Sequence, residues 1–176
     1  RRAVDAAVGP PVDAPFRERL RRDDEAEEVG EGFRVGERDV RFEQGDALTA
    51  LPGAEADLFV AQAFLDLVPL PEAFDAAAAT LAPGGLLYAP ITFDGGTYFQ
   101  PDHPDDEALT EAYHDHIDAQ PGRDARAGRH AIDALTRRPG TLLAVGASDW
   151  VVHPRDGGYP ADERHFLETI LGFVEG

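Results

Sequence analysis

Small polar groups follow two apolar stretches in the first half of the sequence. The stretch VRFEQ ends at Gly45-Asp46-Ala47, and the stretch ADLFV is followed two residues later by Gln62. The first alternates apolar and polar residues, and the second is a continuous apolar run, which is typical of a strand buried on both faces. Ligands of open α/β sheets bind at the carboxyl ends of the strands. The carboxylate and the amide therefore predict a ligand site at these two strand exits.

A second group of polar residues lies in the stretch from Ala112 to His130. His114 and His116 are two residues apart, and side chains at this spacing point apart on a helix, so we expect no metal site here. Tyr113 and His114 either belong to a solvated acidic helix or contact a substrate.

The arginines of the same stretch form a local basic cluster. Arg126 and Arg129 are three residues apart and share one face of a predicted helix. They either pair with the nearby aspartates or recognise an acidic substrate, for which arginine offers bidentate geometry.

Several kinds of catalytic chemistry are excluded by residue type. The chain has no cysteine, so disulfides, thiolate metal sites and cysteine nucleophiles are absent. It has no lysine, and a phosphate-binding loop of the P-loop type requires one. Ser148-Asp149 lacks the G-x-S-x-G context of a hydrolase nucleophile. No catalytic residue can be named from such motifs.

The remaining sequence predicts the elements that position these groups. Apolar runs and turn signals predict strands near residues 1–8, 40–45, 56–64, 86–93 and 141–154. Helical spacing and capping signals predict helices within 12–28, 69–85, 105–120, 124–140 and 160–176. The alternation indicates an α/β fold, a mostly parallel, Rossmann-like sheet with helices on both faces. We expect one domain over residues 1–176.

The composition is strongly acidic. The chain of 176 residues has 34 acidic and 16 basic residues, and the formal net charge is −18. All of the basic residues are arginine. An acidic surface without lysine indicates adaptation to high salt, where cations screen the repulsion between carboxylates. The alternative is an acidic protein from a mesophilic source that is not adapted to high salt.

The same charge limits the partners that we expect. Nucleic-acid binders need a basic face, and the arginines here are scattered among acidic residues, so we expect no nucleic-acid partner. No apolar run approaches the length of a membrane span, and no signal peptide is visible. We therefore expect a cytoplasmic protein that acts on a small molecule; the sequence leaves the oligomeric state open.

The segment from Phe42 to Phe93 resembles the central half of class I S-adenosylmethionine-dependent methyltransferases. In that family a strand ends in an aspartate followed by a small residue, which matches Asp46-Ala47. A buried strand and a helix follow, and then an L-x-P-G-G-x-L element, which matches Leu81 to Leu87. The resemblance implies the methyltransferase fold and S-adenosylmethionine as cofactor.

The resemblance also implies roles for individual residues. Asp46 would accept a hydrogen bond from the adenine amino group, with Gly45 and Ala47 beside it, and Asp5 would hold the ribose hydroxyls. Cofactor and substrate would meet at the exit of the next strand. The residues there are Gln62 and Ala63, on the cofactor side, and Phe64, on the acceptor side. Tyr113, His114 and Arg126 would contribute to the acceptor site.

One part of the family pattern is not matched. The family has a strand and a Gly-rich turn before the acidic residue that corresponds to Asp5, and Gly30, Gly32 and Gly36 follow too late to replace them. We expect this strand and loop to be missing from the sequence. The predicted function is methyl transfer to a small molecule. The alternative is a non-catalytic binding module that has lost the cofactor loop, and a nucleotide-dependent dehydrogenase is a weaker one.

Overall fold

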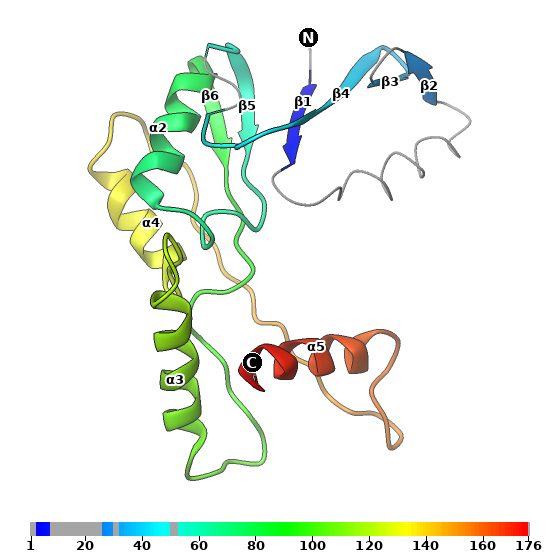
Figure 1. Cartoon of the computed structure of the whole chain (residues 1–176), viewed down its shortest axis with the longest axis vertical. Helices are drawn as coiled ribbons and strands as arrows, with labels where there is room; N and C mark the ends of the chain where they lie inside the picture. The colour runs from blue at the N-terminus through cyan, green and yellow to red at the C-terminus, as the bar shows by residue number, and fades with distance from the viewer. Residues whose placement is uncertain (1–2, 8–25, 30–31, 50–52, 176) are drawn as a thin grey trace. The chain divides into compact units, whose positions relative to one another are not determined.

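The computed structural model describes residues 3–7, 26–29, 32–49 and 53–175 (Figure 1). The chain divides into two compact units, Arg1–Ile91 and Thr92–Gly176. In the described residues, the first unit holds six strands and one helix, and the second holds three helices. The chain is therefore of the α/β kind, as the sequence predicts.

The first sheet of unit 1 contains four strands in the order β1-β4-β3-β2. Strands β1 and β4 run parallel, with Asp5 opposite Phe42, whereas β2–β3 and β3–β4 are antiparallel. The strands are β1 (Ala3–Ala7), β2 (Ala26–Val29), β3 (Gly32–Val35) and β4 (Arg38–Gln44).

A tight hairpin joins β3 to β4. Gly36 lies in its turn with φ of 59°, a conformation that glycine adopts without strain. Phe33 is 2% exposed and packs edge-to-face on Phe42, with ring centroids 6.2 Å apart. A side chain at Gly32 would place its Cβ 2.1 Å from the Val40 carbonyl oxygen, so the strand pair requires glycine there.

The second sheet of unit 1 pairs β5 (Ala56–Val60) with β6 (Leu81–Tyr88) in parallel. Helix α2 (Leu70–Thr80) connects them and contacts both strands. The buried residues of α2 recur at helical spacing and form one stripe: Leu70, Ala73, Phe74, Ala77 and Thr80. This strand–helix–strand unit is a parallel crossover.

The two faces of the β5–β6 sheet differ in burial, because successive side chains of a strand point to opposite faces. Phe59 and Leu87 are half-buried on one face, which we assign to the contact with α2. Leucines, valine and tyrosine on the other face are about half exposed: Leu58, Val60, Leu86 and Tyr88.

Unit 2 contains α3 (Asp106–Asp118), α4 (Ala127–Thr136) and α5 (Glu163–Glu175). The ring of Phe166 on α5 lies 3.8 Å from that of Trp150, measured between centroids. A hydrogen bond to Glu168, together with its charge, raises the pKa of Arg164 on α5. None of the helices described for this chain has both the length and the apolar character to span a bilayer.

The structure corrects several sequence predictions in unit 1. The end of the helix predicted over 12–28 is strand β2, and its other residues lie outside those described. No strand is predicted between residues 28 and 40, yet this segment contains strand β3. Strand β5 has one exposed face, so it is not buried on both. Helix α2 already ends at Thr80, and Pro83-Gly84-Gly85, the end of the stretch predicted as helix, lies inside β6.

One predicted strand of unit 2 is wrong. Residues 141–154 form neither a helix nor a strand, and Leu143, Trp150 and Val151 are mostly exposed. The apolar run has no strand partner in the described residues of its unit, and a strand forms only when its backbone groups pair with a neighbour. The sheet prediction is also only partly met: the described strands form two sheets, with two parallel and two antiparallel pairings.

Candidate functional site

The exit of β4 carries Gly45, Asp46 and Ala47, as predicted. The Asp46 side chain is exposed, and its Oδ1 accepts a hydrogen bond from the Leu48 N–H at 2.9 Å. The Asp46 carbonyl accepts another from the Thr49 N–H at 2.9 Å. These bonds form a turn that fixes the carboxylate directly beyond the strand. In the described residues Oδ2 makes no hydrogen bond, so it is open to a ligand donor.

Strand β1 pairs in parallel with β4 and carries Asp5. The register places Asp5 opposite Phe42, within β4, so Asp46 comes four residues after the position opposite Asp5 and lies beyond the end of the strand. Asp5 is the third residue of the five-residue strand β1. Asp5 thus lies in mid-strand, two residues before the end of β1, whereas Asp46 lies beyond the end of β4.

The exit of β5 carries Gln62, Ala63 and Phe64. The pairing with the β6 side continues past the strand, because the Ala61 N–H donates to Tyr88 at 2.9 Å and the Ala63 N–H donates to the Pro90 carbonyl at 2.8 Å. Ala63 has φ of 50°, which turns the chain sharply after the strand. Gln62 is exposed and Phe64 is half-buried. The amide is therefore accessible at this exit.

Tyr113 and His114, two of the predicted acceptor residues, lie together on α3 in unit 2. Both rings contact Phe93, with centroid distances of 5.7 Å to Tyr113 and 5.8 Å to His114. His114 is 6% exposed, whereas His116 is exposed, so the two histidines do point apart on α3. The structure thus brings Tyr113 and His114 into one aromatic cluster with Phe93.

Arg126, the third predicted acceptor residue, forms an ion pair with Asp118 at 3.2 Å. Arg129 pairs with Asp94 at 3.3 Å. The arginine cluster is thus engaged with nearby carboxylates, as the ion-pair alternative predicts. These pairs are partly exposed, and such pairs contribute little to stability.

Asp94 is a residue that sequence reasoning missed. Its Oδ1 accepts from the backbone N–H groups of Gly128 and Arg129, at 3.0 and 3.3 Å, so it caps the first turn of α4. The Arg129 side chain donates to Oδ2 and, at 2.7 Å, to the Asp94 carbonyl. The sequence signal for this cap is an aspartate that precedes two glycines, but nothing in the local sequence links it to a helix that begins over thirty residues later. Asp94 holds the Phe93 loop to α4.

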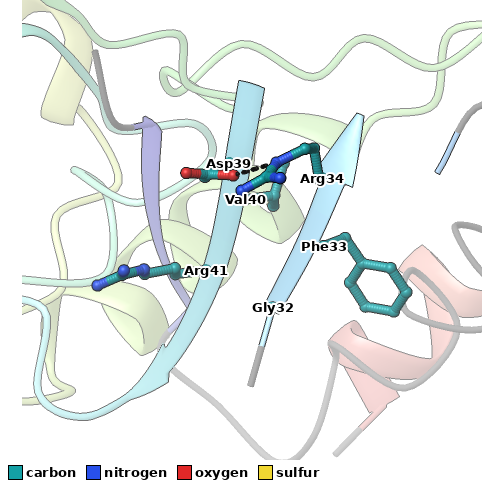
Figure 2. Close-up of a pocket in the computed structure, with 6 residues that line it drawn as sticks. All are labelled: Gly32, Phe33, Arg34, Asp39, Val40 and Arg41. Atoms are coloured by element: carbon teal, nitrogen blue, oxygen red, sulfur yellow. Dashed lines mark hydrogen bonds and ion pairs between the residues drawn. The ribbon is translucent and has the colours of Figure 1, made fainter. Parts of the chain in front are cut away.

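A shallow pocket of about 130 Å³ lies on the β3–β4 hairpin (Figure 2). Figure 2 shows the Arg34 guanidinium directed at the Asp39 carboxylate, and the two are 3.0 Å apart. The lining residues are Gly32, Phe33, Arg34, Asp39, Val40 and Arg41. None of the predicted site residues lines it, and its ion pair neutralises the nearest charges. The pocket therefore offers no group for the predicted chemistry.

Comparison with known proteins gives no assignment. No protein-family model matches the sequence, and neither a similar curated protein nor a similar solved structure was found. Function must therefore be argued from the strand exits and from the aromatic cluster of unit 2.

Proposed function

We propose that this protein has a class I methyltransferase fold and transfers a methyl group from S-adenosylmethionine to a small molecule. In this proposal Asp46 accepts a hydrogen bond from the adenine amino group, and Asp5 pairs with the ribose hydroxyls. Gly45 and Ala47 lie beside the adenine, and Gln62 and Ala63 line the cofactor site.

The single observation that carries the proposal is the pairing of the parallel strands. One common kind of doubly wound sheet contains the strand order 3-2-1-4-5, in which strands 2 and 3 are neighbours and strands 4 and 5 are neighbours. The parallel pair β1–β4 corresponds to strands 2 and 3, and the parallel pair β5–β6 corresponds to strands 4 and 5.

The open edges agree with this order. Among the described strands, β1 pairs only with β4, and β5 pairs only with β6. In the order 3-2-1-4-5 these two strands flank strand 1, which is the strand that precedes the Gly-rich turn. In this proposal strand 1 is not among the described residues and would pair with the open edges of β1 and β5; β2 and β6 are end strands of their sheets as well.

The chemistry suits a site without a catalytic triad. A methyl group on a sulfonium is already activated, and alignment of the acceptor with it supplies most of the rate acceleration. Hydrogen-bonding groups at strand exits provide such alignment. Asp46 meets this need because its turn fixes the carboxylate and leaves Oδ2 open.

The first test is a thermal-shift titration with S-adenosylhomocysteine in molar KCl, on the full-length protein. Binding to the folded state raises Tm as ligand concentration rises. Asp46→Ala should weaken S-adenosylhomocysteine binding about ten- to a hundredfold, because a hydrogen bond to a charged group is worth ~1.5–3 kcal/mol.

Two variants control for changes in structure. Asp46→Asn keeps an oxygen for the Leu48 N–H and should preserve the turn, with a smaller loss of affinity. Asp39→Ala removes an exposed carboxylate from the opposite end of β4 and should leave the affinity unchanged. Wild-type affinity in Asp46→Ala would contradict the proposal. Cofactor binding without methyl transfer to any acceptor would favour the non-catalytic binding module.

A further inference from the structure

His114 is an unusual residue to find at the buried position of α3. The helix is acidic and mostly solvated, and His114 is the one residue among its described positions that is buried. Its ring lies against Phe93 from the preceding loop and beside Tyr113, at centroid distances of 5.8 and 6.5 Å. An imidazole therefore occupies a place where an apolar side chain would satisfy the packing.

The Nε2 atom of His114 is sealed from solvent and has no hydrogen-bond partner in the described part of the chain. A buried polar atom without a partner costs free energy, and most such atoms in folded proteins are paired. A neutral imidazole has one nitrogen that accepts a hydrogen bond. An unpaired nitrogen at this place suggests that the missing partner is a bound molecule.

The walls around this nitrogen are held in place by the rest of unit 2. Asp94, next to Phe93, is anchored to the first turn of α4. Gly95 has φ of 69°, and a Cβ there would lie 3.2 Å from the Ala125 carbonyl oxygen, so the loop packs closely on the segment before α4. The two residues that follow Phe93 are thus both fixed to the segment around the start of α4.

The surroundings define the chemical class of the partner. The group that meets Nε2 must donate or accept a hydrogen bond according to the tautomer of the ring, and an uncharged group loses less than a charged one when it leaves water. The body of the ligand must pack among aromatic rings, for which another ring in an edge-to-face or offset arrangement is well suited. A hydroxyl group on an aromatic ring meets both conditions.

We propose that His114 Nε2 forms a hydrogen bond with the hydroxyl group of a phenol-type ligand whose ring packs against Phe93 and Tyr113. The identification of this ligand as the methyl acceptor rests on the proposed function. The binding site itself is argued from the residues of unit 2 alone. Entry of the ligand requires a movement of the side chains around His114, because Nε2 is covered in the structure.

The test is a titration of the protein with phenol in molar KCl, followed by NMR of the histidine ring nitrogens. The Nε2 resonance of His114 should move saturably, and that of His116, two residues away and exposed, should not. Absence of any change at His114 would overturn the proposal. The proposal would also be overturned if Nε2 already shows a hydrogen bond before phenol is added and its resonance does not respond to phenol, because a buried water would then be its partner.

Variants provide a second measurement by thermal shift. His114→Phe keeps a ring of similar size and should weaken phenol binding at least tenfold, while His116→Phe should bind as the wild type does. Equal binding by both variants would overturn the proposal. If His114→Phe fails to fold, His114→Gln, which keeps an acceptor, replaces it and should retain weak binding.

Failure of this inference can be separated from failure of the proposed function, because phenol binding is measured without cofactor. Binding of phenol without binding of S-adenosylhomocysteine would support the His114 site and contradict the proposed methyltransferase function. Binding of S-adenosylhomocysteine without binding of phenol would support the proposed function and contradict the His114 site.

Discussion

Asp94, a single partly exposed residue of unit 2, holds both a helix and a loop in place. Asp94 is half-buried, yet it accepts two backbone N–H groups at the start of α4 and pairs with Arg129. The first N–H groups of a helix have no partner within the helix, and a capping carboxylate satisfies them and complements the helix dipole. Asp94 therefore fixes both the helix start and the loop that carries Phe93.

We predict that Asp94→Ala lowers the free energy of unfolding by about 1–2 kcal/mol, the usual cost of losing a helix cap. Chemical denaturation in molar KCl measures this. Asp133→Ala is the matched control: it removes an exposed carboxylate from the pair with Arg137 on the same helix. It should change stability by less than ~0.5 kcal/mol. Equal effects of the two substitutions would show that Asp94 is only another surface charge.

At the scale of elements, local patterns predicted the helices better than the strands. Helices α2, α3, α4 and α5 all lie within predicted stretches, because helical hydrogen bonds and spacing are local. A strand depends on a partner that the local sequence does not specify. For this reason the apolar run 141–154 was wrongly predicted as a strand, and the charged hairpin strand β3 was missed.

In the candidate site, too, local features could be predicted from the sequence and contacts between distant residues could not. Asp46 and Gln62 could be placed from sequence because turn residues directly follow apolar strands. The contact of Phe93 with His114, and the capping of α4 by Asp94, join residues far apart in the chain. Nothing in residue type or spacing specifies such contacts, so only the structure could provide them.

The close approach of β3 to β4 gives a prediction for this hairpin. Gly32→Ala should lower the free energy of unfolding by about 1–3 kcal/mol, because the new methyl group would collide with the Val40 carbonyl. Gly172→Ala is the comparison, since nothing lies within 4 Å of its added Cβ and the site is inside α5. It should be stabilising by about 0.5–1 kcal/mol. A neutral Gly32→Ala would mean that the strands are not so close.

At the scale of the whole molecule, repulsion among carboxylates opposes folding. The net charge is −18, and α3 alone presents Glu107, Glu111 and Asp115 at successive four-residue intervals on its exposed side. Like charges at this spacing destabilise a helix, and salt screens them. The net charge and these rows of acidic residues together make stability depend on salt.

We predict that Tm rises as KCl is raised from about 0.1 M to about 1 M, where the screening length falls from ~10 Å to ~3 Å. Differential scanning calorimetry measures the rise. A variant with Glu107→Gln, Glu111→Gln and Asp115→Asn carries three fewer negative charges and should show a weaker dependence on KCl. A Tm that does not change with salt would contradict the interpretation of the acidic surface as salt adaptation.

The exposed apolar stretch 141–151 affects how salt acts on solutions of this protein. Leu143, Trp150 and Val151 are largely exposed, and the stretch belongs to no described sheet or helix. Extended apolar segments with unpaired backbone groups are templates for association between molecules. Sulfate and phosphate strengthen apolar association because they are excluded from protein surfaces. KCl, which mainly screens charge, does not strengthen this apolar association, whereas concentrated sulfate strengthens it and favours precipitation through this stretch.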